Sequence, residues 1–422
     1  MLALVGSEVA FRTMRKQEDS FEIDASKYPV ISAAEFEKRV ENGTKLFILD
    51  NFVLDLTSYI HQHPGGAFLL DQTIGRDISK FFYGGYTLDG NTMVKPGSTN
   101  PALHVHSNVA RKIVLKHIVA VIWSNEIDCA NFKIDHTQTN DVNSFTKSFV
   151  LKVCDESKSH NLRDYFSDPA TLGQHFTVVG LDSSGKMLQE KSRSVRRHYT
   201  IANAMKQPVY TNLVNSLKNS ASVNKELLTD DISDQVSITI KTYKLDKGVA
   251  RLFFNQEKDG CEFTIKGPMG RGLGLTKKSK GTHFAFAAGT GVLVYIDLVA
   301  RLALQELGAI PESQKLDKDF RLVLFASFQK REDAIGLELL EALVDRVNSS
   351  GSVKFELNLR FSNQKSARWD KNFVSKQMEA SKDNLERIWV CGPPLMNESF
   401  EKILEELCET YKINFRTQVD LM

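Results

Sequence analysis

The chain has 422 residues, of which 42% are hydrophobic and 25% are charged. This is the composition of a globular protein that is too long for one hydrophobic core, so we expect two to four domains. The 54 basic and 52 acidic residues leave a net charge of +2, which excludes bulk electrostatic attraction to nucleic acid or to an anionic membrane. The five cysteines are odd in number and far apart, which fits a reducing compartment and argues against a disulfide framework. We therefore expect a cytoplasmic protein, with peripheral association with a membrane left open.

Three blocks follow one another along the chain and differ in pattern. Residues 28–122 begin with short strand-like runs, continue through a His-Pro-Gly-Gly turn and end in an amphipathic pattern over 107–122 that predicts a helix. The polar stretch 125–143, rich in Thr, Asn and Asp, is typical of a linker. Residues 144–276 show strand patterns separated by turn residues, which predict a small antiparallel barrel. In residues 280–422 apolar strands alternate with helical patterns, which predicts a parallel sheet wrapped by helices.

The His-Pro-Gly-Gly turn of the first block is the first candidate site. Pro64 fixes one backbone angle, while Gly65 and Gly66 permit the positive φ of a sharp turn. Such a turn can hold the preceding side chain, His63, pointing into a cavity. His61 lies two residues earlier, so only one of these two imidazoles can occupy an axial position on a metal. The residues that can form an apolar wall for a flat macrocycle are Phe68, Leu69, Leu70, Ile74, Phe81 and Phe82.

Residues 55–82 resemble a known family. They read Asp-Leu-Thr-Ser-Tyr-Ile, then His-Pro-Gly-Gly, then Gly-Arg-Asp-Ile-Ser-Lys-Phe-Phe, and this order resembles the heme-binding domain of cytochrome b5. The resemblance implies an α+β fold, a heme b cofactor and His63 as one axial ligand of the iron. Two imidazole ligands leave no open coordination position, and such an iron passes electrons without activating a substrate.

The second ligand of the iron has three candidates. Tyr86 stands where the compact family domain has its second histidine, while His104 and His106 follow a longer insertion. In the family this histidine is followed by a serine and then by a helix that bears an alanine, and His106 has that context. Ser107 can cap the helix, and Ala110 leaves room beside an imidazole. We therefore predict His106 as the second ligand, with His104 and Tyr86 as the alternatives.

The second block offers flavin-binding residues on one strand. Arg197 and Tyr199 alternate on the strand, so a guanidinium for a phosphate and an aromatic ring for a flat ring system share one face, and Thr200 follows with a hydroxyl. A Leu-Gly-Gln-His run precedes them, and Ile-Lys-Thr-Tyr and Lys-Gly-Pro-Met-Gly runs follow. This ordered set of motifs resembles the FAD domain of the ferredoxin-reductase superfamily. Within that superfamily, the order and kind of the motifs are most similar to those of NADH–cytochrome b5 reductase. The resemblance implies that these three residues bind FAD and that Tyr243 lines its ring. Where the family has a Gly-x-x-Ser/Thr turn for the pyrophosphate, this chain reads Gly-Val-Ala-Arg from Gly248, whose backbone amides can still bind phosphate.

Two loops of the third block close apolar strands. An Ala-Ala-Gly-Thr-Gly run lets backbone amides and a helix N-terminus approach a dinucleotide pyrophosphate. A Cys-Gly-Pro-Pro-Leu-Met run about a hundred residues further on can place a cysteine beside the nicotinamide. Their order, behind a flavin barrel, resembles the NAD(P)H domain of the same superfamily. The predicted cofactor-binding residues are Gly289, Thr290, Gly291, Cys391, Gly392 and Pro393.

The sequence leaves the nicotinamide donor open. Leu293 and Val294 stand where relatives often carry Thr-Pro, which can alter how the helix meets the nicotinamide. Lys330 and Arg331 can contact a 2′-phosphate and favour NADPH, or they can be solvated surface charges. Both NADH and NADPH therefore stay as candidates.

These motifs predict an oxidoreductase that passes electrons from NAD(P)H through FAD to a bis-histidine heme b and on to an external acceptor, either a protein or a small molecule. One alternative is a flavin-dependent reductase of oxygen, ferric chelates or quinones with a regulatory heme domain. Another is a heme- or sterol-binding module with an inert reductase half. The predicted domains are a heme-binding domain over 28–122, an FAD-binding barrel over 144–276 and an NAD(P)H-binding domain over 280–422.

Overall fold

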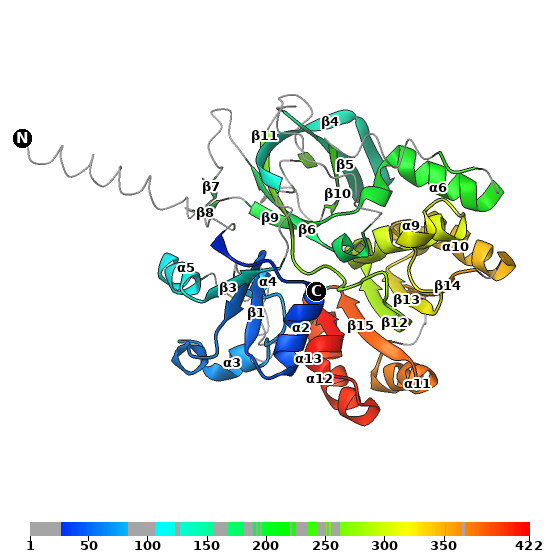
Figure 1. Cartoon of the computed structure of the whole chain (residues 1–422). Helices are drawn as coiled ribbons and strands as arrows, with labels where there is room; N and C mark the ends of the chain where they lie inside the picture. The colour runs from blue at the N-terminus through cyan, green and yellow to red at the C-terminus, as the bar shows by residue number, and fades with distance from the viewer. Residues whose placement is uncertain are drawn as a thin grey trace, which may run out of the picture.

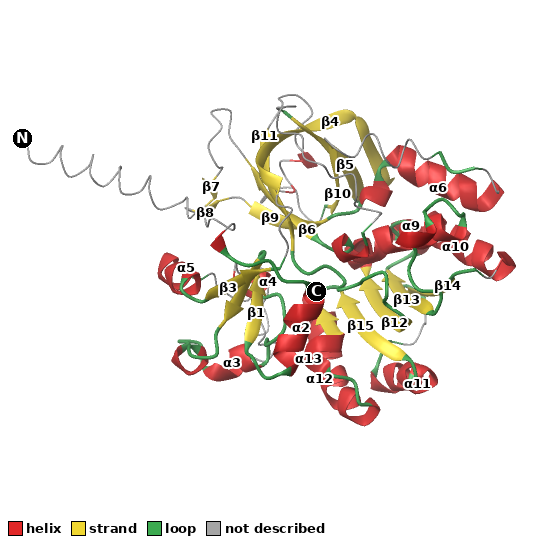
Figure 2. Cartoon of the chain, in the orientation of Figure 1, coloured by secondary structure: helices red, strands yellow, loops and turns green. Residues whose placement is uncertain are grey.

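The structure is a computed structural model in which three parts surround the C-terminus of the chain, as Figure 1 shows. The first part is mixed α and β, the second is a curled antiparallel sheet, and the third is a parallel sheet between helices (Figure 2). This arrangement confirms the predicted fold class. The described residues are 27–82, 106–122, 127–154, 168–180, 189–190, 193–194, 196–219, 222–224, 235–242, 250, 253–254, 262–350, 352–364 and 368–422.

The first part is built on an antiparallel sheet with the order β1-β2-β3. Its helix α2 begins after Ser32, whose Oγ accepts a hydrogen bond from the amide of Glu35 at 3.1 Å and so caps the helix. Fully buried side chains such as Phe36 and Phe47 form a core between helix and sheet. The elements are α2 (Ala33–Glu41), β1 (Leu46–Leu49), β2 (Phe52–Asp55), η2 (Ile60–Gln62), α3 (Ala67–Asp71), α4 (Ser79–Phe82), α5 (Asn108–Leu115) and β3 (Ile118–Val121).

The helix predicted over 107–122 is correct only in its first half. Helix α5 ends at Leu115, and the residues from Ile118 to Val121 form strand β3, which pairs with β2. β-Branched side chains favour the strand, and Ile118 and Ala120 are buried while Val119 between them is exposed. Within this one amphipathic stretch, the spacing of buried residues therefore changes from the helical period to the period of two that is typical of a strand.

The prediction of a linker over 125–143 is wrong, because most of this stretch is strand β4 (Ile127–Asn143). Phe132 and Ile134 are buried on one side of the strand, and Lys133 between them is exposed. β4 pairs with β5 and β11 in the middle of the second sheet, so this sheet begins well before Ser144.

The second part is a six-stranded antiparallel sheet with the order β10-β5-β4-β11-β6-β9. It curls so that its edge strands β10 and β9 approach each other (Figure 1). This curled sheet is the predicted antiparallel barrel. Its remaining elements are β5 (Thr146–Val153), η5 (Pro169–Thr171), β6 (His175–Gly180), β7 (Gln189–Glu190), β8 (Arg193–Ser194), β9 (Arg196–Thr200), η6 (Asn203–Met205), α6 (Gln207–Asn219), β10 (Gln235–Lys241) and β11 (Glu262–Met269).

The third part is a parallel sheet with the order β14-β13-β12-β15-β16. Residues of β12 alternate between its faces: Ala285 packs toward α9 and α10, and Phe286 packs toward α11 and α12. The elements are β12 (Gly281–Ala288), η7 (Gly289–Val292), α9 (Leu293–Glu306), η8 (Glu312–Gln314), β13 (Phe320–Phe328), η9 (Arg331–Asp333), α10 (Leu337–Ser350), β14 (Lys354–Phe361), α11 (Lys371–Ser381), β15 (Leu385–Cys391), α12 (Pro394–Tyr411), α13 (Phe415–Gln418) and β16 (Val419–Leu421).

The order of this parallel sheet reverses between β12 and β15, because the chain winds outward from β12 on one side and from β15 on the other. In open α/β sheets, ligands bind at such a switch point, outside the carboxyl ends of the strands. Among the described residues, no helix is long and apolar enough to cross a membrane.

Candidate cofactor sites

His63 and His106 face each other in the first part, with ring centroids 6.2 Å apart and ring planes inclined by 33°. The ring of His63 lies over Gly65, where an added Cβ would lie 2.9 Å from the Cε1 atom of His63. His106 directly precedes Ser107, whose Oγ accepts a hydrogen bond from the amide of Ala110 at 3.3 Å and fixes the start of α5. A glycine turn and a helix cap thus hold the two imidazoles in place.

Both imidazoles have one ring nitrogen tied to the backbone. The Nδ1 atom of His63 is 3.4 Å from the carbonyl oxygen of Gly66, and that of His106 is 3.1 Å from the carbonyl oxygen of Phe82. Because a carbonyl oxygen only accepts, Nδ1 is the donor in each hydrogen bond, and Nε2 is then the nitrogen through which a neutral imidazole can bind a metal. Metal-ligating histidines commonly make this kind of hydrogen bond. The ring of His106 also stacks on that of Phe82, at 4.5 Å and 7°.

The spacing of the two rings fits one metal ion between them. Two metal–imidazole bonds of about 2 Å, with about 1 Å from each nitrogen to its ring centre, need centroids about 6 Å apart, and 6.2 Å is found. Within the described ranges, no group of three His, Cys, Asp or Glu residues forms a metal site made by protein alone. Two histidine ligands at this spacing suit an iron whose other ligands come from a macrocycle, as in heme.

The other candidate ligands are placed less favourably or not described. His61 is exposed on η2. Tyr86 and His104 lie outside the described residues. The assignment of His63 and His106 as iron ligands stays a prediction, now with a geometry that suits it.

The predicted flavin residues of the second part lie on the edge strand β9, which pairs with β6. Arg197 is exposed, and Tyr199 and Thr200 are half-buried. The ring of Tyr199 meets that of Phe253 edge-to-face at 6.0 Å. Burial raises the pKa of the Tyr199 phenol well above its usual range, so it stays a neutral donor. Tyr243 and Gly248, the other predicted FAD contacts, lie outside the described residues.

The two predicted loops of the third part meet at the switch point of its sheet. β12 and β15 are neighbours, with Ala287 opposite Cys391. An added Cβ on Gly291 would lie 2.0 Å from the carbonyl oxygen of Cys391, so only glycine permits this approach. Gly289 has a φ of +56° and open space around it, while an added Cβ on Gly392 would meet the sulfur of Met396 at 2.6 Å. Thr290 lies between the two glycines of η7 and Pro393 caps α12, so all six predicted residues lie along one edge.

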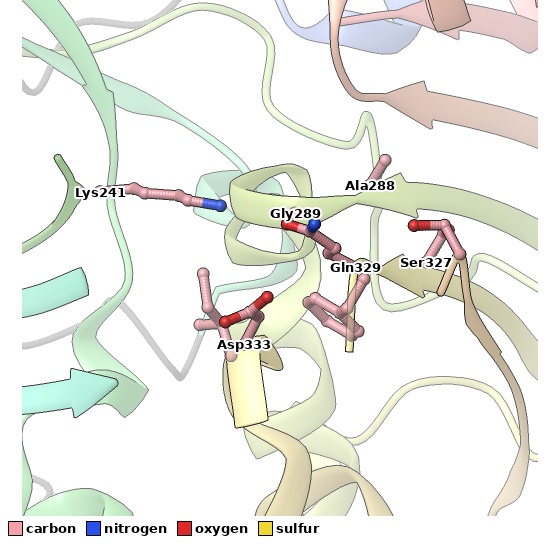
Figure 3. A pocket seen from close by; sticks show the side chains of 9 residues that line it. Lys241, Ala288, Gly289, Ser327, Gln329 and Asp333 are labelled. Atoms are coloured by element: carbon pink, nitrogen blue, oxygen red, sulfur yellow. The ribbon is translucent and has the colours of Figure 1, made fainter. Parts of the chain in front are cut away.

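Two cavities of about 200 and 240 Å³ adjoin this edge and share Ala288 and Ser327 in their walls. Figure 3 shows the first, where Lys241 reaches from β10 toward Gly289 and the carboxylate of Asp333 lies below them. One oxygen of that carboxylate, Oδ1, is buried without a hydrogen-bond partner among the described residues. The second cavity is lined by Arg360, whose Nη1 donates to the Oγ of Ser327 at 3.0 Å.

Four of these lining residues were not predicted from the sequence as site residues: Lys241, Ser327, Asp333 and Arg360. For Ser327 and Arg360 the available signal was their position near the carboxyl ends of the parallel strands β13 and β14, which share one edge of the sheet. Asp333 follows β13 in η9. Lys241 ends β10 of the antiparallel sheet, so this rule gave no signal for it.

The two cations considered for a 2′-phosphate do not line either cavity. Arg331 pairs with Glu341 of α10 at 2.7 Å, and Lys330 lies 3.9 Å from Glu332. All four side chains are at least a third exposed. They are paired surface charges in this structure.

Residues 32–122 match the family model described as "Cytochrome b5-like Heme/Steroid binding domain". This match covers most of the first part, including the His-Pro-Gly-Gly turn and His106. Among curated proteins, no sequence matches the chain.

Three solved structures with similar folds share 14–16% of their residues with this chain. Flavohemoglobin from Malassezia yamatoensis, with bound FAD and heme, gives a TM-score of 0.43 at 16% identity over 74% of this chain. The match spans 63% of the flavohemoglobin, less than two thirds of its length. The CS-b5R domains of human Ncb5or give 0.45 at 15% identity and cover 78% of both chains. Ferredoxin-NADP+ reductase from Plasmodium falciparum gives 0.41 at 14% identity, over 70% of this chain and 95% of its own.

Proposed function

We propose that this chain is an oxidoreductase that passes electrons from NADH through FAD to a bis-histidine heme b and on to an external acceptor. One observation carries the proposal. His63 and His106 face each other at a distance that fits one metal ion between them, and the Nδ1 of each donates a hydrogen bond to a backbone carbonyl oxygen. The same chain has a crevice at the switch point of a parallel sheet.

When bound, FAD accepts two electrons as a hydride and releases them singly, and a six-coordinate heme carries them one at a time. The task of the protein is therefore to bind, orient and shield. His63 and His106 would hold the heme iron through their Nε2 atoms. Phe82 is buried and stacks on the ring of His106, so it would shield that side of the site from water.

In the crevice, the backbone around Gly289 and Gly291 receives the dinucleotide pyrophosphate, and Lys241 adds a positive charge beside it. Gly291 lets the loop that follows β12 touch the loop that follows β15. Cys391 then borders the nicotinamide at the switch point. Arg197, Tyr199 and Thr200 of β9 bind the flavin, together with Tyr243 and Gly248.

Asp333 supports NADH rather than NADPH as the donor. Asp333 lines the first cavity, and its carboxylate can accept a hydrogen bond from a ribose hydroxyl, which is how a carboxylate selects NAD. A 2′-phosphate in the same cavity would instead meet this negative charge. Lys330 and Arg331, which could offset that repulsion, are engaged by glutamates outside the cavity.

The test is anaerobic addition of NADH to the purified chain reconstituted with FAD and heme. We expect the flavin band to bleach and the heme band to sharpen to the ferrous form, with NADPH at least tenfold less effective. The matched control is His63→Ala, in which NADH should still bleach the flavin. Flavin bleaching without heme reduction in the wild-type chain would contradict the proposed route.

A further inference from the structure

The first part is joined to the other two by four buried charged side chains, which we call the docking cluster: Glu37, Arg271, Arg387 and Asp420. Glu37 of α2 accepts from Arg271 at 3.2 Å and from Arg387 at 2.7 Å. Asp420 of β16 pairs with the same two arginines, at 3.3 Å from Arg387. The exposed fractions of these side chains are only 5% to 17%, so the cluster is largely removed from water.

The charges of the docking cluster balance only when the first part is in place. Arg271, Arg387 and Asp420 belong to the second and third parts and sum to one positive charge, which Glu37 neutralises. Burial lowers the pKa of Arg271 to about 10, and the neighbouring Glu37 opposes that shift. A buried charge without its partner is strongly unfavourable, because it loses its contact with water and gains no opposite charge in return. The cluster therefore penalises other orientations of the first part.

A second contact uses the side-chain amide of Asn51, which is buried between β1 and β2. Its Nδ2 donates to the carbonyl oxygen of Pro268 at 3.0 Å, and its Oδ1 accepts from the amide of Gly270 at 3.2 Å. This pair of hydrogen bonds has a fixed direction, as in a peptide ladder. It sets the rotation of the first part against the end of β11.

A third contact lies beside α12 and α13. Arg76 pairs with Glu401 at 2.6 Å, with side chains 6% and 14% exposed, and its guanidinium lies 5.0 Å from the ring centre of Phe415. Gly75 has a φ of +82°, and an added Cβ would lie 2.8 Å from the carbonyl oxygen of Arg416. The two backbones thus touch at this point. Figure 1 shows α2 and α13 side by side, with α3 and α5 on the far side of the first part.

The docked contact connects the two predicted redox sites. On the reductase side, Gly270 lies beside His175, the strand partner of the predicted flavin contact Thr200. On the heme side, Asp77 lies beside Gly270 and precedes α4, whose last carbonyl oxygen holds the Nδ1 of His106. Phe82, at that end of α4, comes only five residues after Asp77. The docked orientation therefore keeps the heme ligand close to the flavin strand.

We propose that Glu37 is a positioning residue for electron transfer, because the docking cluster holds the first part in this one orientation while electrons pass between the flavin and heme sites. This inference rests on the proposed function. In the docked orientation, the heme domain accepts electrons from the flavin of the same chain. Its face on the α3 and α5 side is then left for the external electron acceptor.

The test compares Glu37→Lys with Glu35→Lys in the full chain with both cofactors. Glu35 is the matched control because it lies on the same helix but pairs with Arg39 on the solvent side, at 2.8 Å. Small-angle X-ray scattering reports whether the first part stays docked, independently of activity. Stopped-flow mixing with NADH separates the rate of flavin reduction from the rate of heme reduction. A third variant, Glu37→Gln with Arg387→Gln, removes one charge of each sign and restores the balance of the cluster.

We expect Glu37→Lys to enlarge the radius of gyration and to slow heme reduction at least tenfold, with flavin reduction unchanged. Glu35→Lys should leave all three quantities unchanged, and the balanced double variant should stay compact with heme reduction within threefold of wild type. The proposal is overturned if Glu37→Lys stays compact, or if it expands and still reduces heme at the wild-type rate. Absence of NADH-driven heme reduction in the wild type would instead refute the proposed function, and the scattering comparison would still decide the docking.

Discussion

Gly291→Ala tests whether the nucleotide crevice needs its two loops in contact. The added Cβ would lie 2.0 Å from the carbonyl oxygen of Cys391 and 2.7 Å from its carbonyl carbon. Close carbon–oxygen contacts in proteins are about 3.3–3.6 Å long, so one loop has to move by more than about 1 Å. Both neighbours are backbone atoms at the end of β15, so no side-chain rotation can absorb the change.

The cost of this substitution follows from the clash. Overpacking a well-packed site costs about 1–3 kcal/mol, and a loss of this size on nucleotide binding corresponds to a factor of about 5 to 150. We expect the KM for NADH to rise by this factor. Heme binding should not change, because the three atoms nearest to the added Cβ all belong to Cys391 of β15, in the third part.

The assay is the initial rate of NADH oxidation with ferricyanide as acceptor, together with thermal unfolding. Gly308→Ala is the control: Gly308 has a φ of +66° with open space around it, at the end of α9. That variant should lose about 1 kcal/mol of stability from backbone strain but keep its KM. A KM for Gly291→Ala within twofold of the wild-type value would refute the reasoning.

Three further predictions concern single side chains. Asp333→Ser should raise the ratio of NADPH to NADH in kcat/KM at least tenfold, and an unchanged ratio would remove the argument for NADH. Burial between Phe320 and Trp389 lowers the pKa of His283 to about 3. Its contribution to stability is therefore present above pH 6.5 and is lost as the pH falls toward 3. When the pH falls from 7 to 5, the free energy of urea unfolding should decrease by about 2 kcal/mol less in His283→Phe than in the wild type. Burial raises the pKa of Asp297 from 3.8 to about 7, so its contribution to stability is present below pH 3.8 and is lost as the pH rises toward 7. When the pH rises from 3.8 to 7, the unfolding free energy of Asp297→Asn should decrease by roughly 3 kcal/mol less than that of the wild type.

The architecture could be predicted because, in each part, buried apolar residues recur at the spacing that is typical of strands or of helices. The apolar strands of the third part, such as β12 and β13, alternate with helices along the chain, which leaves a parallel sheet as the simple solution. The failures lie where composition and period disagree. The strand β4 has only two clearly buried apolar residues in its described middle, Phe132 and Ile134, so its polar face resembled a linker. The strand β3 extends an amphipathic helix without a break in hydrophobicity.

The individual site residues could be proposed from the sequence, but the sequence did not show which of them lie next to one another in the structure. Gly291 and Cys391 are a hundred positions apart and touch only because β12 pairs with β15, and the order of strands in a sheet has no local pattern. The docking cluster takes its members from α2, β15, β16 and the segment after β11, so it has no sequence motif at all. The buried oxygen of Asp333 becomes noticeable only when its surroundings are known.

The proposed route of electrons requires that His63 and His106 together hold one heme iron. The direct measurement is the low-temperature electron paramagnetic resonance spectrum of the ferric, heme-loaded chain, recorded for wild type and for single alanine variants. We expect a low-spin bis-imidazole signal in the wild type, its loss in His63→Ala and His106→Ala, and its retention in His104→Ala and in His117→Ala, where His117 instead meets the carbonyl oxygen of Asp55. A low-spin signal that survives His106→Ala and disappears in His104→Ala would contradict the claim.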